Sequence, residues 1–176
     1  MGDAVEVVGH VVAMQGATIS GLLRGVADGG TAPVLIGELV AIPTALGRAF
    51  GIVHGLRKGR RDEDRPAVEI HLLGEMDVRR RQRHFRRGVS SYPTLDAPIL
   101  RASRQETAAV YARPADAHVE VGHLRHDHEL PACLAIDGLL GKNLAILGST
   151  GSGKSCAVTV VLQSLLDTYP FAHMLI

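Results

Sequence analysis

The sequence predicts a small antiparallel β-barrel followed by the start of an α/β domain. The first observation is a series of short, β-branched segments in the first half of the 176 residues, separated by glycine-rich turns. The second is a change after Pro131, where an all-apolar segment, a glycine-rich loop and an apolar helical pattern follow one another. We therefore divide the chain into a barrel, residues 1–130, and a partial α/β domain, residues 131–176.

Five segments of the first half have the strand pattern. The first is rich in valine and roughly alternates, and Gln15-Gly16 follows it as a turn. Short strands of this kind suggest a small antiparallel barrel or sandwich, and further glycines permit the tight curvature that a small barrel needs. The expected strands cover residues 5–12, 17–23, 34–42, 49–56 and 67–73.

The second half has the pattern of parallel α/β structure. Leu144 to Leu147 is a short, all-apolar segment, as the strands of a buried parallel sheet require. Lys154 to Tyr169 is a helix pattern that Pro170 ends, and Phe171 to Ile176 is expected to be a second buried strand. Two strands and one helix cannot cover both faces of a parallel sheet, so we expect this domain to be incomplete in the chain. The expected inner face of the helix consists of Ala157, Val160, Val161, Ser164, Leu165 and Thr168.

Composition excludes two classes of nucleic-acid-binding protein. The formal net charge is +1, so the chain is not globally basic like a histone, and aromatic residues make up 3%, too few for a protein that stacks single-stranded bases on rings. The basic residues are nevertheless concentrated between Arg57 and Arg87, most densely from Arg79 onward. Such a run can contact phosphates, form a solvated loop or pair across a subunit contact.

Two features favour a reducing, cytoplasmic setting. The two cysteines, Cys133 and Cys156, make no disulfide framework and no CxxC motif. The most apolar stretch, residues 34–53, is interrupted by charged residues and a proline, so we expect no membrane span.

One motif carries chemistry, and it matches the pattern GxxxxGK[ST] in full. The composition predicts roughly 0.003 chance matches, and an apolar strand pattern runs in while an apolar helix runs out, as a P-loop requires. An ordinary glycine-rich turn is the alternative, and a dinucleotide fingerprint fits less well because Cys156 stands where the third glycine belongs. The motif is Gly148, Ser149, Thr150, Gly151, Ser152, Gly153, Lys154 and Ser155.

The residue types of the motif explain how it would hold ATP and Mg²⁺. Glycines let successive backbone N–H groups point at phosphate oxygens, and the helix adds its positive N-terminal end. Lys154 places a cation between the β- and γ-phosphates, and the Ser155 hydroxyl is placed to ligate Mg²⁺. We predict that all eight residues of the motif, together with Cys156, bind the nucleotide. The alternative for Cys156 is that it is a small hydrophobic residue of the core and does not contact the nucleotide.

Hydrolysis needs an acidic strand end that holds Mg²⁺ and orients water. Asp167 is the only acid after Ser155, and it lies near the end of the predicted helix. We therefore predict no catalytic residue and expect this chain not to hydrolyse ATP.

A cluster of histidines offers a weaker candidate, a metal site. Two of its members alternate in an extended segment, but zinc sites usually have four ligands and no cysteine pair is nearby. The cluster contains His118, His123, His126 and His128, with Asp127 and Glu129 among them.

These segments together resemble the N-terminal part of a HerA-type ATPase of the HerA/FtsK superfamily. The resemblance is strongest from residue 121 on and is carried by Val121–Leu124, Leu130–Ala132, Leu139–Ser155 and Phe171–Ile176. Phe85–Leu95 and Val8–Val12 resemble segments of the family's N-terminal HAS barrel more loosely. Asn143 departs from the histidine that the family leads us to expect, at a position that should not touch phosphate.

The resemblance implies a HAS barrel followed by a RecA-like P-loop NTPase domain. It also implies a homohexamer, a helicase or hydrolase activity that couples ATP hydrolysis to the movement of duplex DNA, and in some members a nuclease partner such as a NurA-like protein. The family's Walker B strand, arginine finger and DNA-facing loops would lie beyond Ile176.

Two other functions remain open. The chain could be a non-catalytic assembly or partner-binding module that retains a P-loop, as the barrel and the missing carboxylate suggest. It could also be another P-loop NTPase, a kinase or GTPase with an unusual N-terminal extension.

Overall fold

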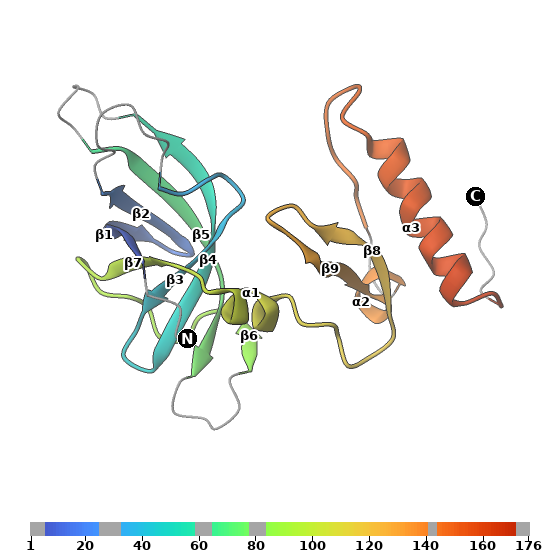
Figure 1. The fold of residues 1–176 in the computed structure, drawn as a ribbon, viewed down its shortest axis with the longest axis horizontal. Helices are drawn as coiled ribbons and strands as arrows, with labels where there is room; N and C mark the ends of the chain where they lie inside the picture. The colour runs from blue at the N-terminus through green and yellow to red at the C-terminus, as the bar shows by residue number, and fades with distance from the viewer. Residues whose placement is uncertain (1–5, 25–32, 59–64, 78–83, 141–143, 172–176) are drawn as a thin grey trace. The chain divides into compact units, whose positions relative to one another are not determined.

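The computed structural model describes residues 6–24, 33–58, 65–77, 84–140 and 144–171 (Figure 1). The chain forms two compact units, Met1–Val110 and Tyr111–Ile176. The expected boundary between residues 130 and 131 falls inside strand β9 (Asp127–Ala135), which belongs to the second unit. The hairpin that contains β9 begins at His118, so these residues are placed with the second unit by their own pairing.

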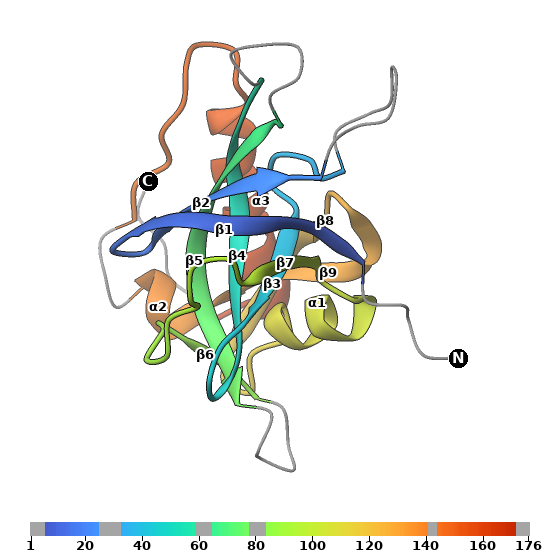
Figure 2. The same cartoon turned by 90° about the vertical axis from the view of Figure 1, so that its left-hand side faces the viewer.

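The first unit is a closed antiparallel barrel of six strands, which confirms the predicted barrel, although β7 was not among the five predicted strands. The order β2-β1-β7-β3-β4-β5 closes because β5 also pairs with β2, and β6 extends the sheet beside β5 (Figure 2). The strands are β1 (Val7–Gln15), β2 (Thr18–Leu23), β3 (Leu39–Pro43), β4 (Gly47–Arg57), β5 (Ala67–Asp77), β6 (Phe85–Arg87) and β7 (Pro98–Arg101).

One predicted turn of the barrel is present, and a second turn shortens a predicted strand. The predicted turn after Gln15 is present, and Gly16 adopts a φ of 58°, which glycine reaches without strain. The third expected strand, residues 34–42, is shorter than predicted because Gly37 takes a φ of 88° in a turn, and β3 begins only at Leu39. Apolar composition alone did not reveal that turn.

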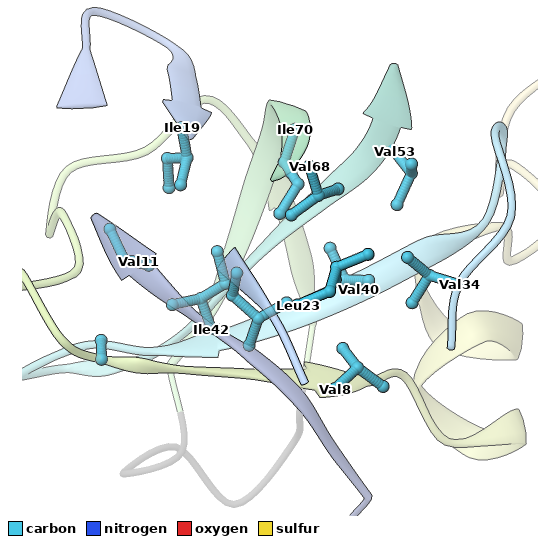
Figure 3. Close-up of a cluster of buried hydrophobic side chains, with 12 residues drawn as sticks. Val8, Val11, Ile19, Leu23, Val34, Val40, Ile42, Val53, Val68 and Ile70 are labelled. Atoms are coloured by element: carbon cyan, nitrogen blue, oxygen red, sulfur yellow. The ribbon is translucent and has the colours of Figure 1, made fainter. Parts of the chain in front are cut away.

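Aliphatic side chains fill the barrel (Figure 3). Val11, Ile19 and Ile70 have no exposed surface, and they come from three different strands. Phe50 is also fully buried and meets the ring of Phe85 edge to face, with centroids 6.3 Å apart. The scarcity of aromatic residues is therefore compatible with a well-filled core.

A short helix, α1 (Arg104–Val110), ends the first unit and is fixed by a capping box. The Ser103 backbone N–H donates to the Glu106 carboxylate at 3.0 Å, and the Glu106 N–H donates back to the Ser103 hydroxyl at 3.3 Å. Glu106 also forms an ion pair with Arg48 of β4, which ties the helix to the barrel wall.

In the residues that the structure describes, the second unit contains one hairpin and two helices. Strand β8 (His118–Leu124) pairs with β9, α2 (Ile136–Leu140) follows directly, and α3 (Lys154–Thr168) packs against β8. Val119 of β8 and Leu165 of α3 are the buried hydrophobic residues among those described here. Of the expected helix face, only Leu165 is buried.

The predicted strand at Leu144–Leu147 is wrong: the segment has no regular structure. A strand needs a neighbour for its backbone hydrogen bonds, and no described strand pairs with this one. Leu144 is 58% and Leu147 89% exposed. The second predicted strand lies outside the described residues except for Phe171, which is in a turn. No helix in the described part of the chain is long and apolar enough to cross a membrane.

Candidate phosphate-binding loop

The glycine-rich loop lies directly before α3 and has the backbone shape that its glycines permit. Gly151 has a φ of 80°, and Gly153, the residue that precedes the helix, has φ 87° and ψ 16°. This left-handed conformation strains residues with a Cβ atom. The Ser152 N–H donates to the Ser149 carbonyl at 3.2 Å and closes the turn between them.

The first turn of α3 presents backbone donors that the helix itself does not use. The earliest helical bond of this end joins the Ala157 N–H to the Gly153 carbonyl at 2.9 Å. Among the described residues no side chain caps this end, and the first turn contains no acid. The N–H groups of Lys154, Ser155 and Cys156 are therefore available to an anion, and the helix dipole favours one there.

Lys154 is folded back over the loop. Its Nζ donates to the carbonyl oxygen of Ser149 at 2.6 Å, which holds the ammonium above the loop backbone. The side chain thus reaches back from the first residue of α3 to the loop, across the turn that contains Gly151 and Gly153. An anion bound by the loop amides would meet the ammonium directly.

All nine predicted nucleotide-binding residues lie in this loop and the first helical turn. Lys154 is half-buried and the others are exposed. Cys156 is thus not a core residue, because α3 buries its other end, at Leu165. The exposed residues are Gly148, Ser149, Thr150, Gly151, Ser152, Gly153, Ser155 and Cys156.

The donor set fits Mg²⁺ bound together with phosphate. The Ser155 hydroxyl is exposed beside Lys154, and Mg²⁺ commonly takes few protein oxygens, completing its shell with water and substrate phosphates. No group of three or more His, Cys, Asp or Glu side chains in the described ranges could hold a metal ion. The histidine cluster lies in these described ranges. Within it, His118 Nδ1 lies 2.9 Å from the Asp116 carbonyl oxygen and His123 Nε2 lies 3.7 Å from a carboxylate oxygen of Glu120.

The arginine-rich run falls largely outside the described residues. Arg79 to Arg83 are not described, whereas Arg86 lies in β6 and pairs with Glu75 at 3.0 Å. Arg87 is exposed on the same short strand. The structure therefore places two arginines of the run in strand β6, and Arg86 is the one that pairs with a carboxylate of β5.

Comparison with known families points to the same segment. Residues 119–176 match the family model for the central domain of helicase HerA. The match supports an ATPase of the HerA/FtsK type. It covers β8, β9, the glycine-rich loop and α3, and it does not extend to the barrel. No curated protein matches the chain.

Proposed function

We propose that this chain is the ATP-binding portion of a ring-forming translocase or helicase that couples ATP hydrolysis to the movement of duplex DNA. The observation that carries the proposal is the complete P-loop motif, found at the N-terminus of α3 with positive φ at Gly151 and Gly153. The match to the central domain of helicase HerA over the same residues supports it.

Different groups of the loop and of the first helical turn bind different parts of Mg²⁺·ATP. The loop glycines and the first-turn N–H groups bind phosphate oxygens, and Lys154 exchanges the Ser149 carbonyl for the β- and γ-phosphates. The Ser155 hydroxyl is the protein ligand that we assign to Mg²⁺. Mg²⁺, when bound, neutralises charge on the phosphates.

The assembly and its partners belong to the same proposal. We propose a homo-oligomer, a hexamer by resemblance, that acts on duplex DNA in the cytoplasm and pairs in some settings with a nuclease. The barrel, which we identify with a HAS barrel, would space the subunits. Exposed Arg87 and the neighbouring arginines of the sequence supply cations that can contact the DNA backbone without reading bases.

Binding of ATP to the chain tests the proposal. Replacing Lys154 by alanine removes a charge-assisted contact worth about 1.5–3 kcal/mol, so affinity for Mg²⁺·ATP should fall by roughly tenfold to a hundredfold. Gln163→Ala, on an exposed position of α3, is the matched control and should bind like the original chain. Equilibrium titration with a fluorescent ATP analogue measures both. Equal affinity of Lys154→Ala and the original chain would sink the assignment.

A second candidate is a non-catalytic assembly module, which the self-contained barrel favours. Its closed sheet and its own hydrophobic core need no nucleotide. Light scattering separates the two functions. Oligomers that form equally in the Lys154→Ala chain and do not respond to ATP favour the module, whereas ATP-dependent assembly favours the motor.

A further inference from the structure

Two histidines form a pair on the wall of the barrel. His54 of β4 and His71 of β5 are both exposed, and their rings are stacked with centroids 4.1 Å apart and an interplanar angle of 14°. They lie 17 positions apart in sequence but on neighbouring antiparallel strands. The match to helicase HerA does not include them.

A β-bulge lies at the pair. Val53 pairs with Ile70, but the next partner of β4 is Gly55, which pairs with Glu69. His54 is therefore the additional residue of the bulge, whereas in a regular ladder it would face Glu69. Its ring stacks on that of His71, on the neighbouring strand.

The described neighbours of the pair are an apolar residue, a hydroxyl residue and an ion pair. His71 lies opposite Ile52 on β4 and Thr18 on β2. Glu69 lies two residues before His71, on the same face of β5, and its carboxylate forms an ion pair with Arg57 at 3.6 Å. A hydrated ion can therefore approach the two rings from solvent without displacing core residues.

Neutral imidazole is a good ligand for Zn²⁺, Cu²⁺ and Ni²⁺. Zinc–nitrogen bonds are about 2.0–2.1 Å long, so one ion can join two ring nitrogens that are up to about 4.2 Å apart. The 4.1 Å distance joins the ring centroids, and the in-plane lone pairs of stacked rings run nearly parallel, so the exposed rings must turn about their side-chain bonds before one nitrogen of each can bind the same ion. Two paired strands of a closed barrel keep the two residues adjacent while the rings turn.

We propose that His54 and His71 form a two-histidine site for a late first-row divalent ion such as Zn²⁺ or Cu²⁺ on the barrel surface. Water completes the coordination shell, so the site binds more weakly than a structural zinc site with four protein ligands. It is independent of the nucleotide-binding loop, and its success or failure says nothing about ATP binding.

Paramagnetic broadening by Cu²⁺ tests the site in the full chain without nucleotide. At substoichiometric Cu²⁺, the amide signals of residues 53–55 and 70–72 should broaden first in a ¹⁵N correlation spectrum. First broadening in the β8–β9 hairpin, which holds other histidines, would overturn the proposal, and this outcome needs no variant.

Variants then test whether both rings bind together. His54→Ala or His71→Ala alone should raise the Cu²⁺ concentration needed for the same broadening by about tenfold or more, because the second contact is lost. His123→Ala, on β8, is the matched control and should leave the broadening of the barrel signals unchanged. Unchanged broadening in either single barrel variant would contradict a shared ion.

Discussion

The two units of the chain bury their side chains very differently. Among the described residues, all buried hydrophobic side chains lie in the barrel unit except Val119 and Leu165. Both units expose some large apolar side chains, but the two most exposed are in the second unit, Leu147 at 89% and Phe171 at 92%. The barrel closes its sheet on itself, whereas the described part of the second unit contains one hairpin and two helices.

This difference indicates that one unit supplies most of the stability and the other carries the candidate binding site. The hydrophobic driving force is proportional to the apolar area removed from water, so the barrel should carry most of the free energy of unfolding. The candidate site lies in an exposed loop that its glycines shape and a helix end supports. Substitutions in the barrel should therefore change the free energy of unfolding with little effect on nucleotide binding. Substitutions in the loop should change nucleotide binding with little effect on the free energy of unfolding.

The largest expected effect is a cavity in the barrel. Phe50→Ala removes a fully buried ring and its edge-to-face contact with Phe85. It should lower the free energy of unfolding by about 3–5 kcal/mol. Val160→Ala, at a 40% exposed position of α3, is the control and should change it by no more than about 0.5 kcal/mol. Urea denaturation followed by circular dichroism measures both. Similar losses in the two variants would show that the units share stability more evenly.

A glycine in the barrel should be less replaceable than one in the second unit. A Cβ atom at Gly74 would lie 2.1 Å from the carbonyl oxygen of Arg86, a backbone atom that cannot rotate away, so Gly74→Ala should cost about 1–3 kcal/mol. Gly138 of α2 has open space, and Gly138→Ala should be neutral or stabilising by up to about 1 kcal/mol. Thermal unfolding of the two variants compares them, and a neutral Gly74→Ala would contradict the close approach of β5 and β6.

The smallest expected effect concerns one carboxylate of the barrel. Hydrogen bonds from the Ser90 hydroxyl and from the Ser90 and Ser91 N–H groups, with one from Arg86, lower the pKa of Glu75 despite an opposing effect of burial. Its contribution to stability is thus complete above the ordinary glutamate pKa and is lost as the pH falls through the lowered value. Glu75→Gln should cost about 1 kcal/mol at pH 7.

Acid should reduce that difference. Denaturant unfolding of the Glu75→Gln variant and the original chain should give values that converge as the pH falls below the ordinary glutamate range. Glu120→Gln, which removes an exposed ion pair with Arg113, is the control from the second unit and should have little effect at any pH. A difference for Glu75→Gln that grows toward acid would show that its carboxylate destabilises the barrel.

The barrel and most of its strands could be predicted from the sequence, but the strand pairs that close it could not. The turn at Gly16 and most strand positions follow from alternation and glycine placement. The closing pairs, such as Ile19 with Ile70, join residues far apart in sequence and leave no local signal. The same holds for the His54–His71 pair, which depends on the register of two neighbouring strands.

The candidate site was the most predictable feature, because its chemistry is written in consecutive residues. The helix start at Lys154 and the positive φ of Gly151 and Gly153 are what the motif requires. The contact between Lys154 and the Ser149 carbonyl was not predictable, because it depends on a side-chain conformation. Leu144–Leu147 has the apolar composition of a buried strand, but a strand exists only with a partner, and composition does not show whether one is present.

The most direct test of the division between the units is a map of nucleotide binding on the full chain. Mg²⁺·ATP should shift the amide signals of Gly148 to Ala157 in a ¹⁵N correlation spectrum, and the signals of the buried barrel strands should stay in place. Shifts that centre on the barrel, or none at the glycine-rich loop at saturating nucleotide, would contradict the account.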